Sequence, residues 1–230
     1  MTETTEGSFL LVNKPIQWTS FDVVNKLRYL LKIRKIGHAG TLDPLATGLL
    51  IVCTGKMTKR IDEFQAQEKE YTGKMILGQT TPSYDLETSP SPPVDFSHLT
   101  AEEIFAATRR FTGKIQQMPP AHSSIKVNGK RAYSFARKGQ DVALKSREVE
   151  IKEFEVTGIA LPEVSFRVVC SKGTYIRSLA HDVGAALGVG AYLSELCRTR
   201  IGAFTLDQAE TLEELKHRFM HAQPSNDILP

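Results

Sequence analysis

The spacing of apolar side chains predicts a chain of mixed strands and helices. Residues 9–12 (FLLV) form a short unbroken apolar run, typical of a buried strand, and residues 49–53 form another. Between them, apolar residues recur at helical spacing from Val23 to Leu31, behind the helix-capping pair Thr19-Ser20. Residues 69–77 alternate between polar and apolar positions, which predicts a further strand.

The second half of the chain continues this mixture. Two capping boxes, each a threonine followed three residues later by glutamate, predict helices that begin after Thr100, extending to about Phe111, and after Thr211. The remaining segments are expected as strands at 147–159 and 164–171 and as a helix at 176–187 that ends before Gly188. Because strands and helices do not alternate strictly, we expect an α+β protein rather than a doubly wound parallel sheet.

Length and composition exclude several classes of protein. The chain has 230 residues, of which 41% are apolar and 24% charged, so disorder is excluded as its main state. No apolar run approaches the roughly 20 residues that span a bilayer, and we expect a cytoplasmic protein without a membrane partner. The 3 cysteines are far apart and form no C-x-x-C pair, which argues against a disulfide framework and a cysteine zinc site.

The charge is unevenly distributed along the chain, although the net charge is only +3. Residues 23–42 contain five basic side chains and no acid, and residues 104–140 contain eight basic side chains and no acid. The rest of the chain holds 16 basic residues and all 26 acids. Two basic segments within an acidic chain favour a polyanionic partner, which charge alone does not identify as RNA, DNA or an acidic protein.

The most unusual segment is residues 37–48 (GHAGTLDPLATG), a loop by its glycine and proline content that contains one carboxylate. Asp43 in such a loop is a candidate nucleophile, general base, metal ligand or turn residue. His38 is the only nearby metal-ligating type and no further ligand follows at a usual spacing, which argues against a metal site. A nucleophilic aspartate is kept ionised by a neighbouring cation, and Arg177, at the start of a predicted helix, is a candidate partner.

These motifs make the chain similar to the TruB family of tRNA pseudouridine synthases. Residues 37–48 resemble the family signature GHxGTLDPxAxG, and Asn13-Lys14-Pro15 with Thr19-Ser20 resembles its opening NKPxGxTS. Later blocks are similar in order: residues 69–71 (KEY), 117–120, 124–126, 133–139, 172–177 and 193–198. Two positions depart from the family pattern, with Gln17 and Thr88 in place of glycines.

The resemblance implies a pseudouridine synthase fold with a mixed, mainly antiparallel sheet flanked by helices. The implied reaction isomerises uridine 55 in the T-loop of tRNA, by flipping the base and by nucleophilic attack, without a cofactor or metal. Asp43 matches the nucleophile, which attacks either the sugar or the uracil ring, and Arg177 matches the arginine that pairs with it. Tyr71 matches a tyrosine that packs against the target base and is a candidate for proton removal.

The resemblance also implies how the RNA is bound. His38 matches a histidine that occupies the space of the flipped base, Tyr175 and Leu196 match walls of the uracil pocket, and Asp85 and Lys14 match substrate-binding positions. Residues 116–139 match an RNA-binding insertion, called the thumb here. The basic residues expected along its phosphates are Lys126, Lys130, Arg131, Arg137 and Lys138.

For domain organisation, we expect a single catalytic domain at residues 8–215, with disordered tails at 1–7 and 223–230. Too few residues follow Thr211 for the C-terminal RNA-binding PUA domain of many relatives, so we expect none. The tRNA T-arm is the expected partner of a monomeric enzyme. The alternative hypothesis is an RNA-binding or tRNA-remodelling protein without turnover.

Overall fold

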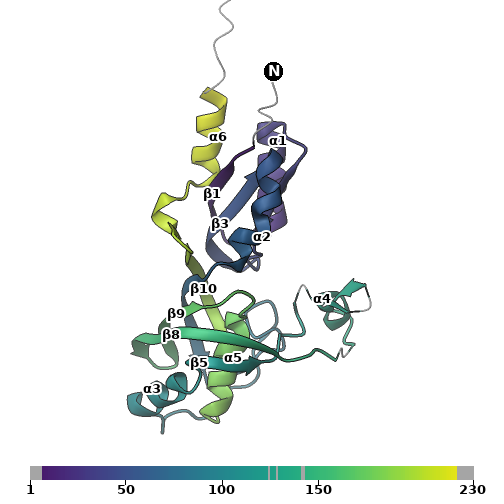
Figure 1. Ribbon diagram of the computed structural model, residues 1–230. Coiled ribbons are helices and arrows are strands. Elements are labelled where there is room, and N and C mark those ends of the chain that lie inside the picture. Colours follow the sequence, from purple (N-terminus) through teal and green to yellow (C-terminus); the bar gives the residue numbers. More distant parts are fainter. Residues whose placement is uncertain (1–6, 124, 128, 141–142, 222–230) are drawn as a thin grey trace, which may run out of the picture. The chain divides into compact units, whose positions relative to one another are not determined.

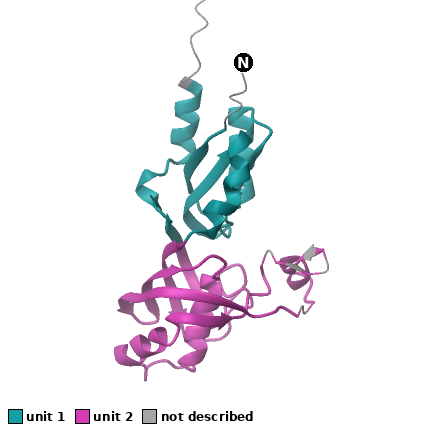
Figure 2. Cartoon of the chain, viewed as in Figure 1, with its two compact units in different colours: residues 1–67, 197–230 teal, residues 68–196 magenta. Residues whose placement is uncertain are grey.

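The computed structural model describes residues 7–221 apart from 124, 128, 141 and 142. Contacts divide the chain into two compact units, residues 1–67 with 197–230 (unit 1) and residues 68–196 (unit 2), shown in Figure 2. The expectation of one catalytic domain at 8–215 stays a prediction. The tails expected to be disordered lie outside the described residues, except for Gly7.

Unit 1 is built on strand β3 (Ala46–Thr54). Strands β1 (Phe9–Lys14) and β2 (Ile36–Ala39) each pair with β3 in antiparallel register, and the part of β10 (Ala191–Ile201) that belongs to unit 1 is also its neighbour. The other elements of this unit are α1 (Ser20–Leu31), a 3-10 helix (Gly55–Arg60), α2 (Ile61–Ala66), β11 (Phe204–Thr205), a second 3-10 helix (Leu206–Gln208) and α6 (Leu212–His221).

The core of unit 1 lies on both faces of β3, because its side chains point alternately to opposite sides. Leu50 and Val52 pack with apolar residues of α1 and α6, including Leu27 and Leu215. Leu49, Ile51 and Cys53 pack on the other face, in a cluster that includes Phe64 of α2. Two apolar faces explain why the sequence of β3 is an unbroken apolar run rather than an alternating one.

Helix α1 begins where the sequence predicts. Thr19 accepts a hydrogen bond from the Asp22 N–H at 3.0 Å, and the Asp22 carboxylate accepts one from the Thr19 N–H at 2.9 Å. This reciprocal capping box satisfies two helix N–H groups that would otherwise lack partners. The helix ends at Lys32, whose backbone is left-handed with φ of 55°.

Unit 2 contains the strand order β10-β4-β9-β8-β5, with the first part of β10 at one edge (Figure 1). Strand β4 (Lys69–Leu77) pairs with β9 (Glu163–Cys170), β9 with β8 (Arg147–Ala160), and β8 with β5 (Gly113–Gln117), each in antiparallel register. The other elements are α3 (Ala101–Arg109), the two-stranded hairpin β6 (Lys126–Val127) and β7 (Lys130–Arg131), α4 (Ala132–Ala136) and α5 (Ile176–Ala186).

The α+β class and most predicted elements are confirmed, with three corrections. Residues 37–39 belong to β2 and residues 46–48 to β3, so the loop expected over 37–48 is shorter, because these ends pair in the sheet. Strand β10 was not expected from its sequence, which does not alternate cleanly. Nor were β5 and the short elements α2, β6, β7 and α4. In the described part of the chain, no helix has the length and apolar character needed to cross a membrane.

Candidate active site

Asp43 lies in the loop between β2 and β3, where its side chain is half-buried. The loop leaves the sheet at Gly40, whose φ of 89° is left-handed and therefore favours glycine. It returns through a turn in which the Ala46 N–H donates to the Asp43 carbonyl at 3.1 Å. Both ends of this short loop are therefore attached to the sheet of unit 1, which places the Asp43 carboxylate on a short, tethered backbone.

Ser20, the first residue of α1, holds the residue before Asp43. Its hydroxyl donates to the Leu42 carbonyl at 3.1 Å and accepts from the Leu42 N–H at 2.9 Å. Both residues are buried, with 2% of Ser20 and 3% of Leu42 exposed. One side chain therefore satisfies both backbone groups of Leu42, and the start of α1 is tied to the loop that carries Asp43.

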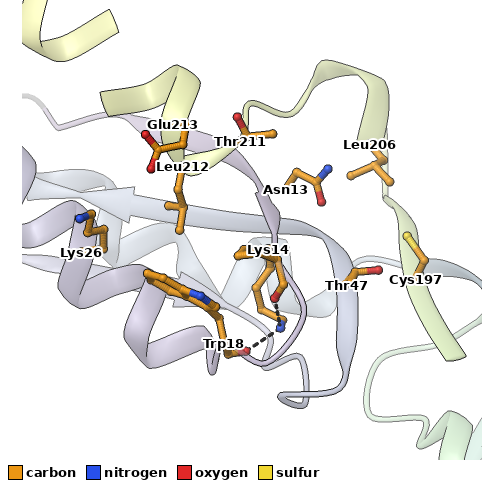
Figure 3. A pocket seen from close by; sticks show the side chains of 11 residues that line it. Asn13, Lys14, Trp18, Lys26, Thr47, Cys197, Leu206, Thr211, Leu212 and Glu213 are labelled. Atoms are coloured by element: carbon orange, nitrogen blue, oxygen red, sulfur yellow. Dashed lines mark hydrogen bonds between the residues drawn. The ribbon is translucent and has the colours of Figure 1, made fainter. Parts of the chain in front are cut away.

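Lys14 is fully buried beneath this loop rather than at the protein surface. Its ammonium donates to the carbonyls of Pro15 at 2.9 Å and Trp18 at 2.6 Å (Figure 3), and to the Pro44 carbonyl at 3.4 Å. Burial lowers the pKa of Lys14 to about 8, although the nearby Asp43 carboxylate opposes that shift. The substrate-binding role expected for Lys14 stays a prediction, and its ammonium joins two loop backbones beside Asp43.

A cavity of about 520 Å³ in unit 1 shares Lys14 and Trp18 with this network (Figure 3). Its lining is mainly apolar, with the side chains of Asn13, Cys197 and Leu206 among those drawn in the figure. Lys14, which lines the cavity, also donates to the carbonyl of Pro44, the residue after Asp43. The cavity therefore touches the Lys14 network that supports the Asp43 loop, but Asp43 itself does not line it.

Arg198 of β10 is a second buried cation near the loop, and only 1% of it is exposed. Its guanidinium donates to the Leu49 carbonyl at 2.7 Å and to the Gly40 carbonyl at 3.1 Å. Gly48 has φ of 102°, and a Cβ there would lie 2.4 Å from the Arg198 carbonyl oxygen. Arg198 therefore fixes both sides of the Asp43 loop, a role that sequence spacing does not reveal.

His38, in β2, is half-buried within the same unit. Burial, and then the Arg198 guanidinium, lower the pKa of His38, so its imidazole is neutral at neutral pH. Its Nδ1 is buried and has no hydrogen-bond partner among the described residues. His38 thus brings a neutral, incompletely bonded ring to the segment that carries Asp43.

Arg177 and Asp85 form the centre of the candidate residues in unit 2. Arg177, at the start of α5, donates to the carbonyls of Ser83 and His122, each at 2.9 Å. Its Nε lies 3.5 Å from Asp85 Oδ2, and 3% of Arg177 and 6% of Asp85 are exposed. The guanidinium therefore joins three segments of unit 2 and has a buried carboxylate beside it.

The other candidate residues of unit 2 are held by the sheet. Tyr71 lies on β4 opposite Val168 of β9 and is buried. The buried Gln117 side chain donates to the Tyr175 carbonyl at 3.0 Å and accepts from its N–H at 2.8 Å. Leu196, on β10, is half-buried. Gln117 thus positions Tyr175 from the end of β5, just where the predicted thumb begins.

The predicted thumb, residues 116–139, contains the β6–β7 hairpin and α4, which Figure 1 shows apart from the sheet of unit 2. Arg137 donates to Glu87 at 2.7 Å and lies over the ring of Tyr133. Arg131 and Lys138 are exposed. The side chains of Lys126 and Lys130 lie outside the described part of the structure. An ion pair with Glu87 therefore ties the thumb to the segment around Asp85, which the sequence did not predict.

The candidate residues thus fall into two groups, one in each unit. Unit 1 brings together Asp43, His38 and Lys14, and unit 2 brings Arg177 to Asp85 and Tyr175 to the thumb. Sequence reasoning missed Ser20 as a loop support, Arg198 and Gln117, since all three act through contacts with residues distant in sequence. Across the part of the chain that the structure describes, no three His, Cys, Asp or Glu side chains gather as a metal cluster would require.

Family comparisons cover most of the chain. A family model described as "TruB family pseudouridylate synthase (N terminal domain)" matches residues 28–176. Another, "tRNA pseudouridylate synthase B C-terminal domain", matches residues 177–229. Curated relatives named "tRNA pseudouridine synthase B" include one from Parabacteroides distasonis, 56% identical over 91% of this chain and 92% of the relative. One from Flavobacterium johnsoniae is 54% identical over 89% of this chain and 92% of the relative.

Solved structures give the same fold. One protein chain in a crystal structure of a Cbf5–Nop10–Gar1 complex is 34% identical to this chain, with a TM-score of 0.72 over 93% of this chain. This chain is 31% identical to one in a structure of an H/ACA RNP bound to a substrate RNA containing 2'-deoxyuridine, with a TM-score of 0.69 over 91% of this chain. It spans only 54% and 52% of those chains. The expected pseudouridine synthase fold is confirmed.

Proposed function

Since the chain belongs to the TruB family of pseudouridine synthases, which are isomerases, we propose that it converts uridine 55 in the T-loop of tRNA to pseudouridine, with Asp43 as the nucleophile. The observation that carries the proposal is the 56% identity over 92% of a relative named "tRNA pseudouridine synthase B". The tRNA substrate makes the cytoplasm the proposed location.

The geometry of unit 1 supports a nucleophilic role for Asp43. A nucleophile needs a fixed position, and Ser20, Lys14 and Arg198 attach the backbone on both sides of Asp43 to three different elements. The mutual attraction between the Lys14 ammonium and the Asp43 carboxylate favours the ionised form of the aspartate. A held, charged carboxylate in a loop fits covalent catalysis better than a simple turn.

The proposed reaction needs no net gain or loss of atoms. The bond between the sugar C1' and uracil N1 breaks while Asp43 holds one of the fragments covalently. The uracil then turns, a bond forms between C1' and C5, and the bond to Asp43 breaks. C5 loses its proton and N1 takes one up, directly or through solvent. If Asp43 attacks the uracil ring, covalent capture keeps the detached base in the site during its rotation; if it attacks the sugar, the walls of the base pocket must hold the base.

The residues of unit 2 supply the proposed base pocket. Tyr71 and Tyr175 offer aromatic faces to an extruded uracil, and Leu196 offers an apolar wall. A stacked uridine must first leave its loop, which costs a few kcal/mol, and we assign His38 to the space that it vacates. The neutral, incompletely bonded imidazole of His38 supports this assignment, because RNA contacts can complete its hydrogen bonds.

Tritium release tests the activity directly. tRNA transcripts carrying tritium at uridine C5 are incubated with excess protein, and release of label is expected from wild type but not from Asp43→Asn. A transcript with cytidine at position 55, labelled at its remaining uridines, is expected to release none. The Asn variant should still bind tRNA, because the amide keeps the size of the side chain. No release with wild type contradicts the enzyme proposal, and equal release from both transcripts contradicts the position.

The thumb is proposed to bind phosphates of the T-arm. If the five basic residues expected there each neutralise one phosphate, the logarithm of affinity falls with that of salt at a slope of about −3.5 to −4.5. The Glu87 pair already occupies Arg137, so the slope should lie at the shallow end of this range. The slope for a thumb variant with Arg131 and Lys138 changed to Gln should be shallower still. A slope near zero in the wild-type protein would contradict the assignment of the thumb to phosphate binding.

A further inference from the structure

The five basic residues in segment 23–42 have no part in the site or in the thumb. In the structure these residues lie on α1 and in the turn between α1 and β2, within unit 1. The charged side chains at Lys32, Arg34 and Lys35 are exposed. A cluster of exposed cations without acids in the segment is unexplained by the packing of α1, whose buried face is apolar.

A surface hollow of about 510 Å³ lies between the ends of α1 and α6. We call it the Tyr29 surface, and it is lined by Arg28, Tyr29, Leu30, Lys32, Phe219 and Met220. Tyr29 is 85% exposed and Met220 is 60% exposed, so an aromatic ring and an apolar side chain face solvent beside two cations.

Two cations, Arg28 and Lys32, line the Tyr29 surface, and Arg28 also donates to the Asn25 side chain. Among the described residues, neither Arg28 nor Lys32 pairs with a carboxylate. The acids of α6 are engaged in its first turn, where Glu213 pairs with Lys216 at 3.6 Å and Glu214 accepts from the Thr211 N–H at 2.7 Å. An anion at the hollow would therefore meet two available cations.

Lys32 has a backbone conformation that glycine adopts more easily. It closes α1 with φ of 55°, and its N–H donates to the Arg28 carbonyl. Glycine is the usual residue at such a helix end, because it has no Cβ to strain. Lys32 therefore places a charge beside Tyr29 at a position where the left-handed backbone alone favours glycine.

We propose that the Tyr29 surface is a second RNA-binding site, which takes an unpaired nucleotide of the substrate RNA. The base stacks on the exposed ring of Tyr29, and the adjoining phosphates contact Arg28 and Lys32. An exposed aromatic ring flanked by cations suits this ligand because every base has a face to stack and each nucleotide carries a negative charge. The inference rests on the proposed function, since it assigns a second contact to the same tRNA.

Binding of unmodified tRNA transcript to the full chain tests this site. Tyr29→Ala is expected to raise the Kd about tenfold through loss of stacking. The double variant Arg28→Gln/Lys32→Gln should make the salt slope shallower by about 1.4 to 1.8, the value for two phosphates. Single-turnover tritium release at saturating protein should stay at the wild-type rate in both variants, because Arg28, Tyr29 and Lys32 have no assigned role in the chemistry or in holding the Asp43 loop.

Two matched variants separate binding from folding. Phe21→Ala removes another exposed aromatic residue of α1, 59% exposed and next to Asp22 instead of two cations, and should leave the Kd unchanged. Lys32→Gly should keep or raise Tm, because it relieves the left-handed backbone, while it weakens tRNA binding. If Lys32 served only to close the helix, Lys32→Gly would leave the Kd unchanged.

The outcomes distinguish this inference from the proposed function. Wild type that releases no tritium contradicts the enzyme proposal, whereas weaker binding by Tyr29→Ala would still support the RNA site. Wild-type release combined with unchanged Kd and salt slope in the variants overturns the RNA site. A change in oligomeric state on Tyr29→Ala, measured by sedimentation, with unchanged RNA binding also overturns it and identifies a protein contact.

Discussion

Replacing Ser20 with alanine should slow catalysis out of proportion to its effect on stability. The change removes the two hydrogen bonds that its hydroxyl makes with Leu42, at 3.1 and 2.9 Å. Because both residues are at least 97% buried, the N–H and carbonyl of Leu42 would lose their partner away from water. Each unsatisfied group costs about 1–3 kcal/mol, so we expect the two to cost about 2–6 kcal/mol.

The adjacent Thr19 provides the control. Thr19→Ala removes the capping box of the same helix, which is exposed and does not touch Leu42, and should cost about 1 kcal/mol. Urea unfolding measures the stability of both variants, and single-turnover tritium release measures the chemical step at a temperature where both are folded. We expect Thr19→Ala to keep the wild-type rate and Ser20→Ala to lose it, because only Ser20 holds the residue before Asp43.

Two results would refute this reasoning. If Ser20→Ala keeps the wild-type rate, the loop does not need Ser20 to position Asp43. If both variants slow in proportion to their lost stability, the effect belongs to α1 as a whole rather than to the contact with Leu42. Partial rescue of Ser20→Ala at lower temperature, with the rate still below that of Thr19→Ala, would agree with a local loss of position.

Three further predictions follow from burial. Burial raises the pKa of Asp182 to about 6, so its ionised carboxylate destabilises the fold at pH 7. The free energy of unfolding should therefore rise as pH falls toward 4. Urea unfolding should show that Asp182→Asn adds about 1 kcal/mol at pH 7 and flattens this pH dependence. Burial raises the pKa of the Cys53 thiol to about 11, so native protein should react with a thiol reagent at Cys197 and not at Cys53, as mass spectrometry can show. Gly48→Ala should lower Tm strongly, because its Cβ would meet the Arg198 backbone and φ is left-handed.

The helices and strands that the sequence predicts are those whose signals come from residues close together along the chain. The capping box of Thr19 and Asp22 lies within four residues, and the apolar run of β3 records burial on both faces. Strand β10 is different, because its buried residues form a run at its start and occur singly farther along, so buried and exposed positions do not alternate. Local pattern therefore predicts α1 and β3 and misses β10.

The candidate site divides in the same way. The motif that contains Asp43 is contiguous and was found from sequence, whereas its supports come from far along the chain. Arg198 reaches the Leu49 carbonyl across 149 residues, and Ser20 reaches Leu42 across 22. A hydrogen bond between a side chain and a distant backbone carbonyl leaves no pattern in one sequence, because any backbone can accept it.

Burial separates two kinds of cation that composition counts alike. Lys14 and Arg198 are buried and donate to backbone carbonyls, whose hydrogen bonds offset the cost of removing their charge from water. Removing either would leave carbonyls unsatisfied around Asp43 and should reduce stability and catalysis together. Arg28 and Lys32 have no comparable set of partners, so their removal should change RNA affinity and leave the fold intact. This difference in burial is what allows RNA binding and catalysis to be perturbed separately in one small protein.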